Sequence, residues 1–161
     1  MAKVKEEKTN VMRTLEQKKI PYTAYTYPTE GGAMDGVSVA AYLGVDPEEV
    51  FKTLVARGAS KGIYVFVIPV ADSLDLKKAA KAVGEKSVEM VAVKEINVLT
   101  GYIRGGCSPV GMKKQYPTVF HETVEIIDTI MVSAGKIGAQ VELNPAALME
   151  LVGGTAADIV V

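Results

Sequence analysis

The chain of 161 residues has one cysteine, one histidine and no tryptophan, and these shortages limit its chemistry. A single cysteine excludes an internal disulfide and any metal site built from several cysteines. A single histidine, His121, excludes a cluster of histidine ligands and leaves one base for a Ser-His-Asp or Cys-His arrangement. The segments GASKG (58–62) and GGTAAD (153–158) lack the GxxxxGK[ST] spacing of a phosphate loop. We therefore expect no metal and no cofactor.

Long apolar runs and an excess of charge are also missing. The apolar stretch IYVFVIPV (63–70) is as long as a strand and too short to span a membrane. The N-terminal segment MAKVKEEKTN is charged and has no apolar signal core, so we expect a cytoplasmic protein with no membrane partner. The net charge is −1, with a sequence pI of about 5.9. Because general nucleic-acid binders carry a basic surface, we expect no DNA partner, although a few lysines could hold one end of an RNA.

What is present is typical of one globular domain over residues 1–161. Apolar residues make up 48% of the chain and charged residues 23%, close to the globular average. We find no internal repeat and no linker. Helices are predicted at 11–19, 38–43, 76–83, 93–100 and 146–152, with one helical turn after Asp46. Strands are predicted at 22–27, 51–57, 63–70, 87–90, 118–121, 129–133, 139–143 and 157–161.

The order of these segments favours a mixed sheet. The strands 51–57 and 63–70 are joined by GASKG, which predicts an antiparallel hairpin, and the second strand is apolar enough to be central. Some of the other strands are separated by helices, whereas 118–121, 129–133 and 139–143 follow one another without one. The mixture of hairpins and helical crossovers favours an α+β fold with a mixed, curled sheet over a doubly wound parallel sheet.

The stretch TGYIRGGCSPVGMKK (100–114) is the strongest candidate for a binding loop. It holds four glycines, the only cysteine and a Ser-Pro turn. Gly105 and Gly106 leave no side chain in the way of a ligand, and Ser108-Pro109 fixes a turn. Apolar segments on both sides predict a loop held in place by a scaffold. A plain glycine-rich turn is the alternative.

Several side chains have both a functional and a structural interpretation. Lys52 begins a strand and shares a face with Leu54, so its ammonium could bind a phosphate or hydroxyl in a cleft or could lie at the surface. Ser133 could point into the same cleft or bond its own turn. The lysines of residues 76–83 are expected to form a solvated face. Cys107 is expected to be a packed side chain, because a thiol nucleophile needs a base and His121 shows no partner.

Five segments taken together resemble the YbaK/EbsC family of stand-alone editing proteins, which are related to the insertion domain of bacterial prolyl-tRNA synthetase. They are FKTL (51–54), LKKAAKAVG (76–84), KSVEM (86–90), TGYIRGGCSPVG (100–111) and VSAGKIG (132–138). The resemblance implies a half-open barrel flanked by helices. It also implies a deacylase that hydrolyses mischarged Cys-tRNA(Pro), in trans, alongside prolyl-tRNA synthetase.

The resemblance also implies the site residues. The catalytic set is Lys52, Gly105 and Gly106, and the substrate-binding set is Tyr27, Ser108, Pro109, Ser133 and Arg104. In the implied mechanism the substrate's own thiol attacks its carbonyl and expels the tRNA, so the protein needs no nucleophile. Lys52 would hold the terminal adenosine, and backbone N–H groups near Gly105 and Gly106 would stabilise the oxyanion.

Three positions depart from the family pattern. Cys107 and Arg104 stand where aliphatic residues are usual, and Ile137 stands where an arginine is usual. Our hypothesis is that Arg104 supplies the positive charge that position 137 lacks. Two other functions stay open: an Ala-tRNA(Pro) deacylase that activates water, and a module that binds tRNA or the synthetase without turnover. A small-nucleotide binder is more remote. The acidic pI predicts weak, salt-sensitive RNA binding.

Overall fold

The computed structural model describes residues 8–32 and 34–161. Most of the charged N-terminal segment and Ala33 of the loop before the second helix therefore lie outside the described residues. Within the described part, the α-helices are α1 (Asn10–Gln17), α2 (Gly36–Leu43), α3 (Leu76–Val83), α4 (Val93–Thr100) and α5 (Pro145–Val152), with short 3-10 turns η1 (Pro47–Glu49) and η2 (Glu122–Glu125). The strands are β1 (Tyr22–Thr26), β2 (Phe51–Gly58), β3 (Ile63–Pro69), β4 (Val88–Met90), β5 (Thr118–His121), β6 (Ile130–Ser133), β7 (Ala139–Leu143) and β8 (Thr155–Ala157).

The helices begin and end within two residues of the predicted bounds. The N–H of Met12 donates to Thr9 Oγ1 at the start of α1, and the N–H groups of Lys77 and Lys78 donate to Asp75 at the start of α3. Glycines in the left-handed conformation close α2, α3, α4 and α5. Caps of this kind satisfy backbone groups that have no partner inside the helix.

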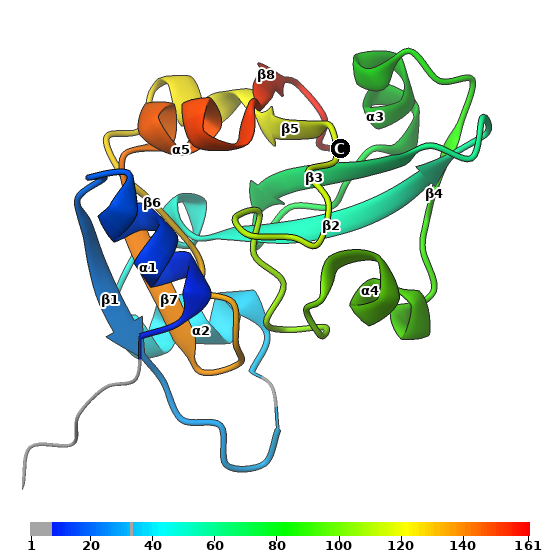
Figure 1. Cartoon of the computed structure of the whole chain (residues 1–161). Coiled ribbons are helices and arrows are strands. Elements are labelled where there is room, and N and C mark those ends of the chain that lie inside the picture. Colours follow the sequence, from blue (N-terminus) through cyan, green and yellow to red (C-terminus); the bar gives the residue numbers. More distant parts are fainter. Residues whose placement is uncertain (1–7, 33) are drawn as a thin grey trace, which may run out of the picture.

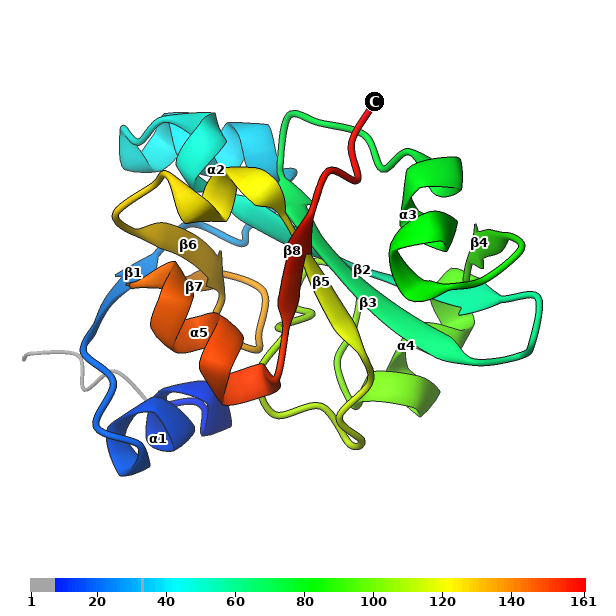
Figure 2. The ribbon, with the colours of Figure 1, turned by 90° about the horizontal axis from the view of Figure 1, so that it is seen from above.

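The strands form two sheets (Figures 1 and 2). The larger has the order β4-β2-β3-β5-β8; β2 and β3 form the predicted antiparallel hairpin, and β3, β5 and β8 run parallel. The smaller is antiparallel, with the order β1-β7-β6. A bridge between Val50 and Met131 joins the two. The α+β class with mixed pairing is confirmed, but the strands divide into two sheets, which do not close into a barrel.

Strand β3 is central because both of its faces are covered. Val65 and Val67 belong to the main core, which also contains Leu15 of α1, Val141 of β7 and Leu148 of α5. Phe66 and Ile68 point to the other side, where they pack with alanines of α3. This double burial explains the continuous apolar run of β3.

The predicted strand at the C-terminal end is displaced. The structure places β8 at Thr155–Ala157, beside β5, instead of at 157–161. Ile159 is fully buried against the second core cluster, and Val160 makes only an isolated bridge with Leu74. Burial of Ile159 takes the chain away from the sheet, so the ladder ends earlier than the apolar pattern suggests. In the described residues, no helix combines the length and apolarity needed to cross a bilayer.

Candidate active site

A cavity of about 600 Å³ lies where the start of β2 meets the smaller sheet and the loop after α4. This volume is in the range of small-molecule sites. Its wall includes the following residues: Tyr27, Met34, Asp35, Gly36, Val37, Val39, Val50, Phe51, Lys52, Thr53, Leu54, Val70, Arg104, Gly105, Cys107, Ser133 and Gln140. Five predicted site residues, from distant parts of the sequence, are therefore brought together: Tyr27, Lys52, Arg104, Gly105 and Ser133.

Lys52 supplies a partly buried positive charge to the cavity. It is the second residue of β2 and pairs with Ile68 of β3, so its backbone is fixed by the hairpin. Burial lowers the pKa of Lys52 from its usual value, and the carboxylate of Asp72 opposes this shift. An ammonium that has lost part of its hydration is stabilised by an anionic or strongly polar ligand. The position of Lys52 in the wall favours the cleft over the surface interpretation.

The glycine pair is needed for two different reasons. Gly105 has a φ of +89° and lines the cavity, a conformation that other residues adopt at a cost. Gly106 has backbone packed against it: a Cβ there would lie 3.0 Å from both the carbonyl carbon of Lys136 and the nitrogen of Ile137. The loop after α4 is therefore pressed against the turn between β6 and β7.

The predicted oxyanion donors need a correction at Gly106. Its N–H donates to the carbonyl of Ile103 at 2.9 Å, within a turn. Gly106 itself does not line the cavity, whereas its neighbours Gly105 and Cys107 do. Within the described part of the chain, the N–H groups of Gly105 and Cys107 make no hydrogen bond. These two N–H groups are the better candidates for a developing negative charge.

Ser108 and Pro109 do not line the cavity, contrary to the expectation that they bind substrate. Both are buried, and the hydroxyl of Ser108 accepts a hydrogen bond from the N–H of Val110 at 3.3 Å. Nearby, the Tyr102 hydroxyl donates to the carbonyl of Val110, and the Tyr116 hydroxyl donates to that of Leu99 at 2.7 Å. The Ser-Pro turn is therefore a buried, structural part of the loop.

Tyr27 and Ser133 form the wall on the side of the smaller sheet. Each is only 7% exposed. The N–H of Tyr27 donates to the carbonyl of Gly138, and the Ser133 hydroxyl accepts from the N–H of Gly135 at 3.1 Å. Ser133 thus satisfies both interpretations, because it bonds its own turn and also lines the cavity.

Among the wall residues that were not predicted, two have a buried polar atom with no partner among the described residues. They are Thr53, through Oγ1, and Gln140, through Oε1. Gln140 lies opposite Ser133 in the β6–β7 pair. Buried polar atoms are normally hydrogen-bonded, so each of these oxygens is an unpaired acceptor inside the wall of the cavity. A glutamine inside the apolar strand AQVEL was a weak signal in the sequence; a threonine in a strand gives none.

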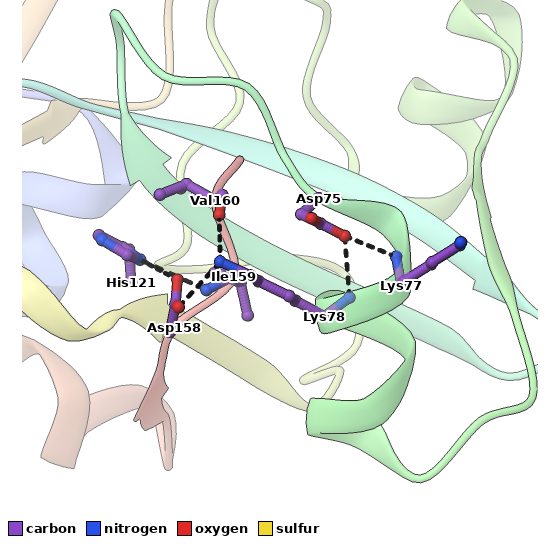
Figure 3. Close-up of polar contacts among 7 residues, drawn as sticks. All are labelled: Asp75, Lys77, Lys78, His121, Asp158, Ile159 and Val160. Atoms are coloured by element: carbon purple, nitrogen blue, oxygen red, sulfur yellow. Dashed lines mark hydrogen bonds and ion pairs between the residues drawn. The ribbon is translucent and has the colours of Figure 1, made fainter.

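The cavity does not contain a Cys-His pair. Cys107 lines the wall, but burial raises the pKa of its thiol to about 11, so it stays protonated near neutral pH. His121 lies outside the wall. Its Nδ1 accepts from the N–H of Ile159 at 3.4 Å and lies 4.0 Å from Asp158 Oδ1 (Figure 3). The sequence showed no partner for His121 because its partners come from the C-terminal segment.

One lysine of α3 is paired with a carboxylate, although the lysines of this helix were expected to form a solvated face. Lys78 Nζ lies 2.9 Å from Asp158 Oδ2 and donates to the carbonyl of Val160 at 2.8 Å (Figure 3). Lys77 and Lys81 are exposed as expected. The cluster of Lys78, His121 and Asp158 therefore fastens the C-terminal segment to α3 and β5, on a surface that does not belong to the cavity.

Asp35 is the one carboxylate among the described wall residues. It accepts a hydrogen bond from the N–H of Ser38 at 2.7 Å, as the cap of α2. Hydrogen bonds from the backbone and the side chain of Ser38 to the carboxylate lower the pKa of Asp35 below its usual value. A carboxylate with a lowered pKa is a weak base, so Asp35 is poorly suited to activate water.

Comparison with known proteins agrees with this geometry. The aminoacyl-tRNA editing domain family matches residues 31–151. A protein of Enterococcus faecalis (strain ATCC 700802 / V583), named as a candidate Cys-tRNA(Pro)/Cys-tRNA(Cys) deacylase EbsC, is 49% identical over 160 residues, which cover 99% of this chain and 98% of that protein.

Solved structures show the same fold. A candidate trans-editing enzyme for prolyl-tRNA synthetase superposes with a TM-score of 0.81 at 25% identity, covering 94% of each chain. A hypothetical protein superposes with a TM-score of 0.84 at 24% identity, covering 94% of this chain and 99% of that one, which supports the fold alone. The family match spans the site loop and strands β2 to β7, and the relative matches almost the whole chain. The chain belongs to the aminoacyl-tRNA editing domain family, as the five sequence segments suggested.

Proposed function

We propose that this protein is an aminoacyl-tRNA deacylase that removes cysteine from mischarged Cys-tRNA(Pro). The observation that carries the proposal is the composition of the cavity wall. It holds a partly buried lysine and a glycine loop, while its cysteine is kept protonated and the histidine lies elsewhere. Such a wall can hold and orient an ester, but it offers no nucleophile with a base beside it. The names of the E. faecalis relative and of the solved trans-editing enzyme point to the same activity.

A substrate that carries its own nucleophile needs only to be positioned. The cysteine thiol of the substrate attacks the ester carbonyl, so a sulfur–carbon bond forms as the carbon–oxygen bond to the ribose breaks. The thiol proton ends on the ribose oxygen, which leaves with the tRNA. Holding thiol and carbonyl in a reactive geometry supplies much of the rate, because the reaction becomes unimolecular.

The residues of the wall have separate roles in this scheme. The ammonium of Lys52 holds the terminal nucleotide through a phosphate or hydroxyl oxygen. The N–H groups of Gly105 and Cys107 donate to the carbonyl oxygen as charge develops there.

The alternative reaction, hydrolysis of Ala-tRNA(Pro) by activated water, needs a base in the cavity. Asp35 is the carboxylate of the described wall, and its lowered pKa makes it a weak base. The wall therefore favours the cysteine substrate. We further propose that the protein acts in the cytoplasm, in trans, beside prolyl-tRNA synthetase, as the name of the solved trans-editing enzyme suggests for that protein.

The test is deacylation of tRNA(Pro) charged with cysteine, alanine or serine. Serine places a hydroxyl where cysteine has its thiol and so isolates the role of sulfur. The variants are Lys52→Ala and Lys52→Arg, and Lys77→Ala serves as control because Lys77 is an exposed lysine of α3 outside the cavity wall.

We expect the wild type to release cysteine and to spare alanine and serine. Lys52→Ala should abolish release, Lys52→Arg should restore it only in part, and Lys77→Ala should match the wild type. Release of alanine at a similar rate would reject the thiol mechanism and leave the site intact. Release of no amino acid would reject the deacylase and favour a module that binds tRNA or the synthetase without turnover.

A further inference from the structure

Charge is divided sharply between the two sides of the cavity, although the chain as a whole is nearly neutral. Residues 28–50 contain five acidic residues and no lysine or arginine, and they supply the wall from Met34 to Val50. Residues 96–121 and 129–141 contain no acidic residue and four basic ones: Arg104, Lys113, Lys114 and Lys136. We name these four residues the basic rim.

The residues of the basic rim come from two segments that lie against each other: the loop after α4, which lines the cavity, and the turn between β6 and β7. Arg104 is itself part of the wall. A Cβ at Gly101 would lie 3.3 Å from Lys113 Cγ, and the Lys113 N–H donates to the carbonyl of Thr100 at 3.0 Å, so Lys113 lies beside the start of the same loop.

Lys136 belongs to the second of these segments, the turn between β6 and β7. The backbone of Lys136 lies against Gly106, as described above. The side chain of Tyr102 fills the space beside both Gly111 and Gly135, so it packs the two loops together. The loop that follows α4 is therefore packed against the turn between β6 and β7.

All four side chains of the basic rim are exposed. Within the described chain, none of them lies within 4.0 Å of a carboxylate, whereas Lys8, Arg57 and Lys78 each pair with one. Unpaired basic side chains beside a cavity attract a polyanion and steer it to that side. The acidic segment 28–50 repels the same polyanion from the other side.

Resting on the proposed function, we propose that the basic rim binds the phosphates of the tRNA acceptor end and so fixes the direction from which the aminoacyl ester enters the cavity. Lys52 holds the last nucleotide inside, and the rim holds the phosphodiester backbone that leads away from it. Contacts from basic side chains to phosphates position a nucleic acid and carry no sequence information directly. The rim therefore supplies affinity with little preference among tRNA sequences, and the aminoacyl group in the cavity supplies selection.

The strength of this binding follows from counterion release. Each phosphate contact contributes about 0.7 to 0.9 to the slope of log affinity against log salt. Four contacts therefore predict that a fourfold rise in salt weakens tRNA binding by about 50- to 150-fold. With only Arg104 of the rim left, the rim's contribution to the same loss of binding falls to about threefold.

The experiment compares the wild type with a variant carrying Lys113→Gln, Lys114→Gln and Lys136→Gln. None of these three residues lines the cavity. The matched control carries Lys77→Gln, Lys81→Gln and Lys86→Gln, three exposed lysines in and after α3. Binding of uncharged tRNA(Pro) is measured by fluorescence anisotropy from about 50 to about 200 mM salt. Turnover is measured with cysteinyl-adenosine, which carries the ester and no phosphate.

We expect the rim variant to lose most of the salt dependence and to bind tRNA far more weakly at low salt, while the control matches the wild type. All three proteins should release cysteine from cysteinyl-adenosine at similar rates. A rim variant with the salt slope of the wild type would overturn the proposal. If the variant also loses cysteinyl-adenosine turnover, each single replacement must still lower the slope by about 0.7 to 0.9, or the proposal fails. Since binding is measured without turnover, absence of deacylation rejects the proposed function without rejecting the rim.

Discussion

Replacing Gly106 by alanine tests whether the close approach of two loops builds the site. Gly106 is the point at which the loop after α4 meets the turn between β6 and β7. A Cβ at this position would lie 3.0 Å from the carbonyl carbon of Lys136, 3.0 Å from the nitrogen of Ile137 and 3.1 Å from Lys136 Cα. All three neighbours are backbone atoms, which cannot turn away as a flexible side chain can. The two loops must therefore separate by several tenths of an ångström.

The cost can be estimated from packing and chain entropy. Overpacking a tight contact costs about 1–3 kcal/mol. Alanine recovers about 0.4–1 kcal/mol by restricting the unfolded chain, so the net loss in the free energy of unfolding is about 1–2 kcal/mol. For a domain of this size the melting temperature falls by about 2–8 °C. Gly105 and Cys107 line the cavity on either side of Gly106, and a displacement of up to about 1 Å there can lower kcat/KM by about 100-fold.

The assay pairs thermal unfolding with release of cysteine from Cys-tRNA(Pro). Gly84→Ala is the matched control, because Gly84 ends α3 with a φ of +72° and has no neighbour within 4 Å of the added Cβ. The left-handed conformation makes this replacement cost about 1–2 kcal/mol, similar to that at Gly106. We expect both variants to lose thermal stability and only Gly106→Ala to lose activity. Normal turnover and an unchanged melting temperature in Gly106→Ala would refute the argument that this contact holds the loop.

Two further predictions concern titratable groups of the cavity. Because burial lowers the pKa of Lys52 from 10.5, kcat/KM should fall with rising pH before that value is reached, as the ammonium loses its proton. Between the folded-state value and 10.5 the unfolded chain binds more protons at this position, so the free energy of unfolding should rise with pH in the same window. The rise in the free energy of unfolding should be absent in Lys52→Met, and an activity profile that is flat up to pH 10.5 in the wild type contradicts the assignment. Burial raises the pKa of Cys107 to about 11 from an ordinary value of 9.0, which lowers the thiolate fraction near neutral pH by about 100-fold. Because the thiolate is the form that reacts, iodoacetamide should modify the native protein about 100-fold more slowly than the urea-unfolded protein. Equal rates would show that the thiol is not buried as described.

The local signals in the sequence were reliable because their causes are local. Thr9, Asp75 and Asn144 cap helices by bonding N–H groups two or three residues away, and the glycines that end α2, α3 and α5 adopt the left-handed conformation beside them. The apolar run of β3 and the short GASKG connection fixed the central hairpin in the same way. The family resemblance predicted that Tyr27, Lys52 and Ser133 share one site. No local pattern could have predicted this, because the three residues are far apart in the sequence.

Other features depended on contacts between distant segments. Ser108 and Pro109 have the composition of a binding turn, but both are buried in the folded loop and do not line the cavity. From the sequence, the N–H of Gly106 was a candidate oxyanion donor. In the folded loop this N–H donates to the carbonyl of Ile103 instead. The C-terminal strand was misplaced because Ile159 finds a buried position in the second core cluster.

By itself, the sequence determined which chemistry is excluded. One histidine and one cysteine leave no room for a metal cluster of those ligands, and the apolar and glycine patterns determined the helices, the hairpin and the site loop. Only the tertiary structure decided which polar groups meet. It brought Thr53 and Gln140 to one cavity, took His121 away from it and gathered four basic residues from two loops beside it. The physical reason is that caps and turns form between near neighbours in the chain, whereas a site forms from side chains whose positions depend on how two sheets and their loops pack.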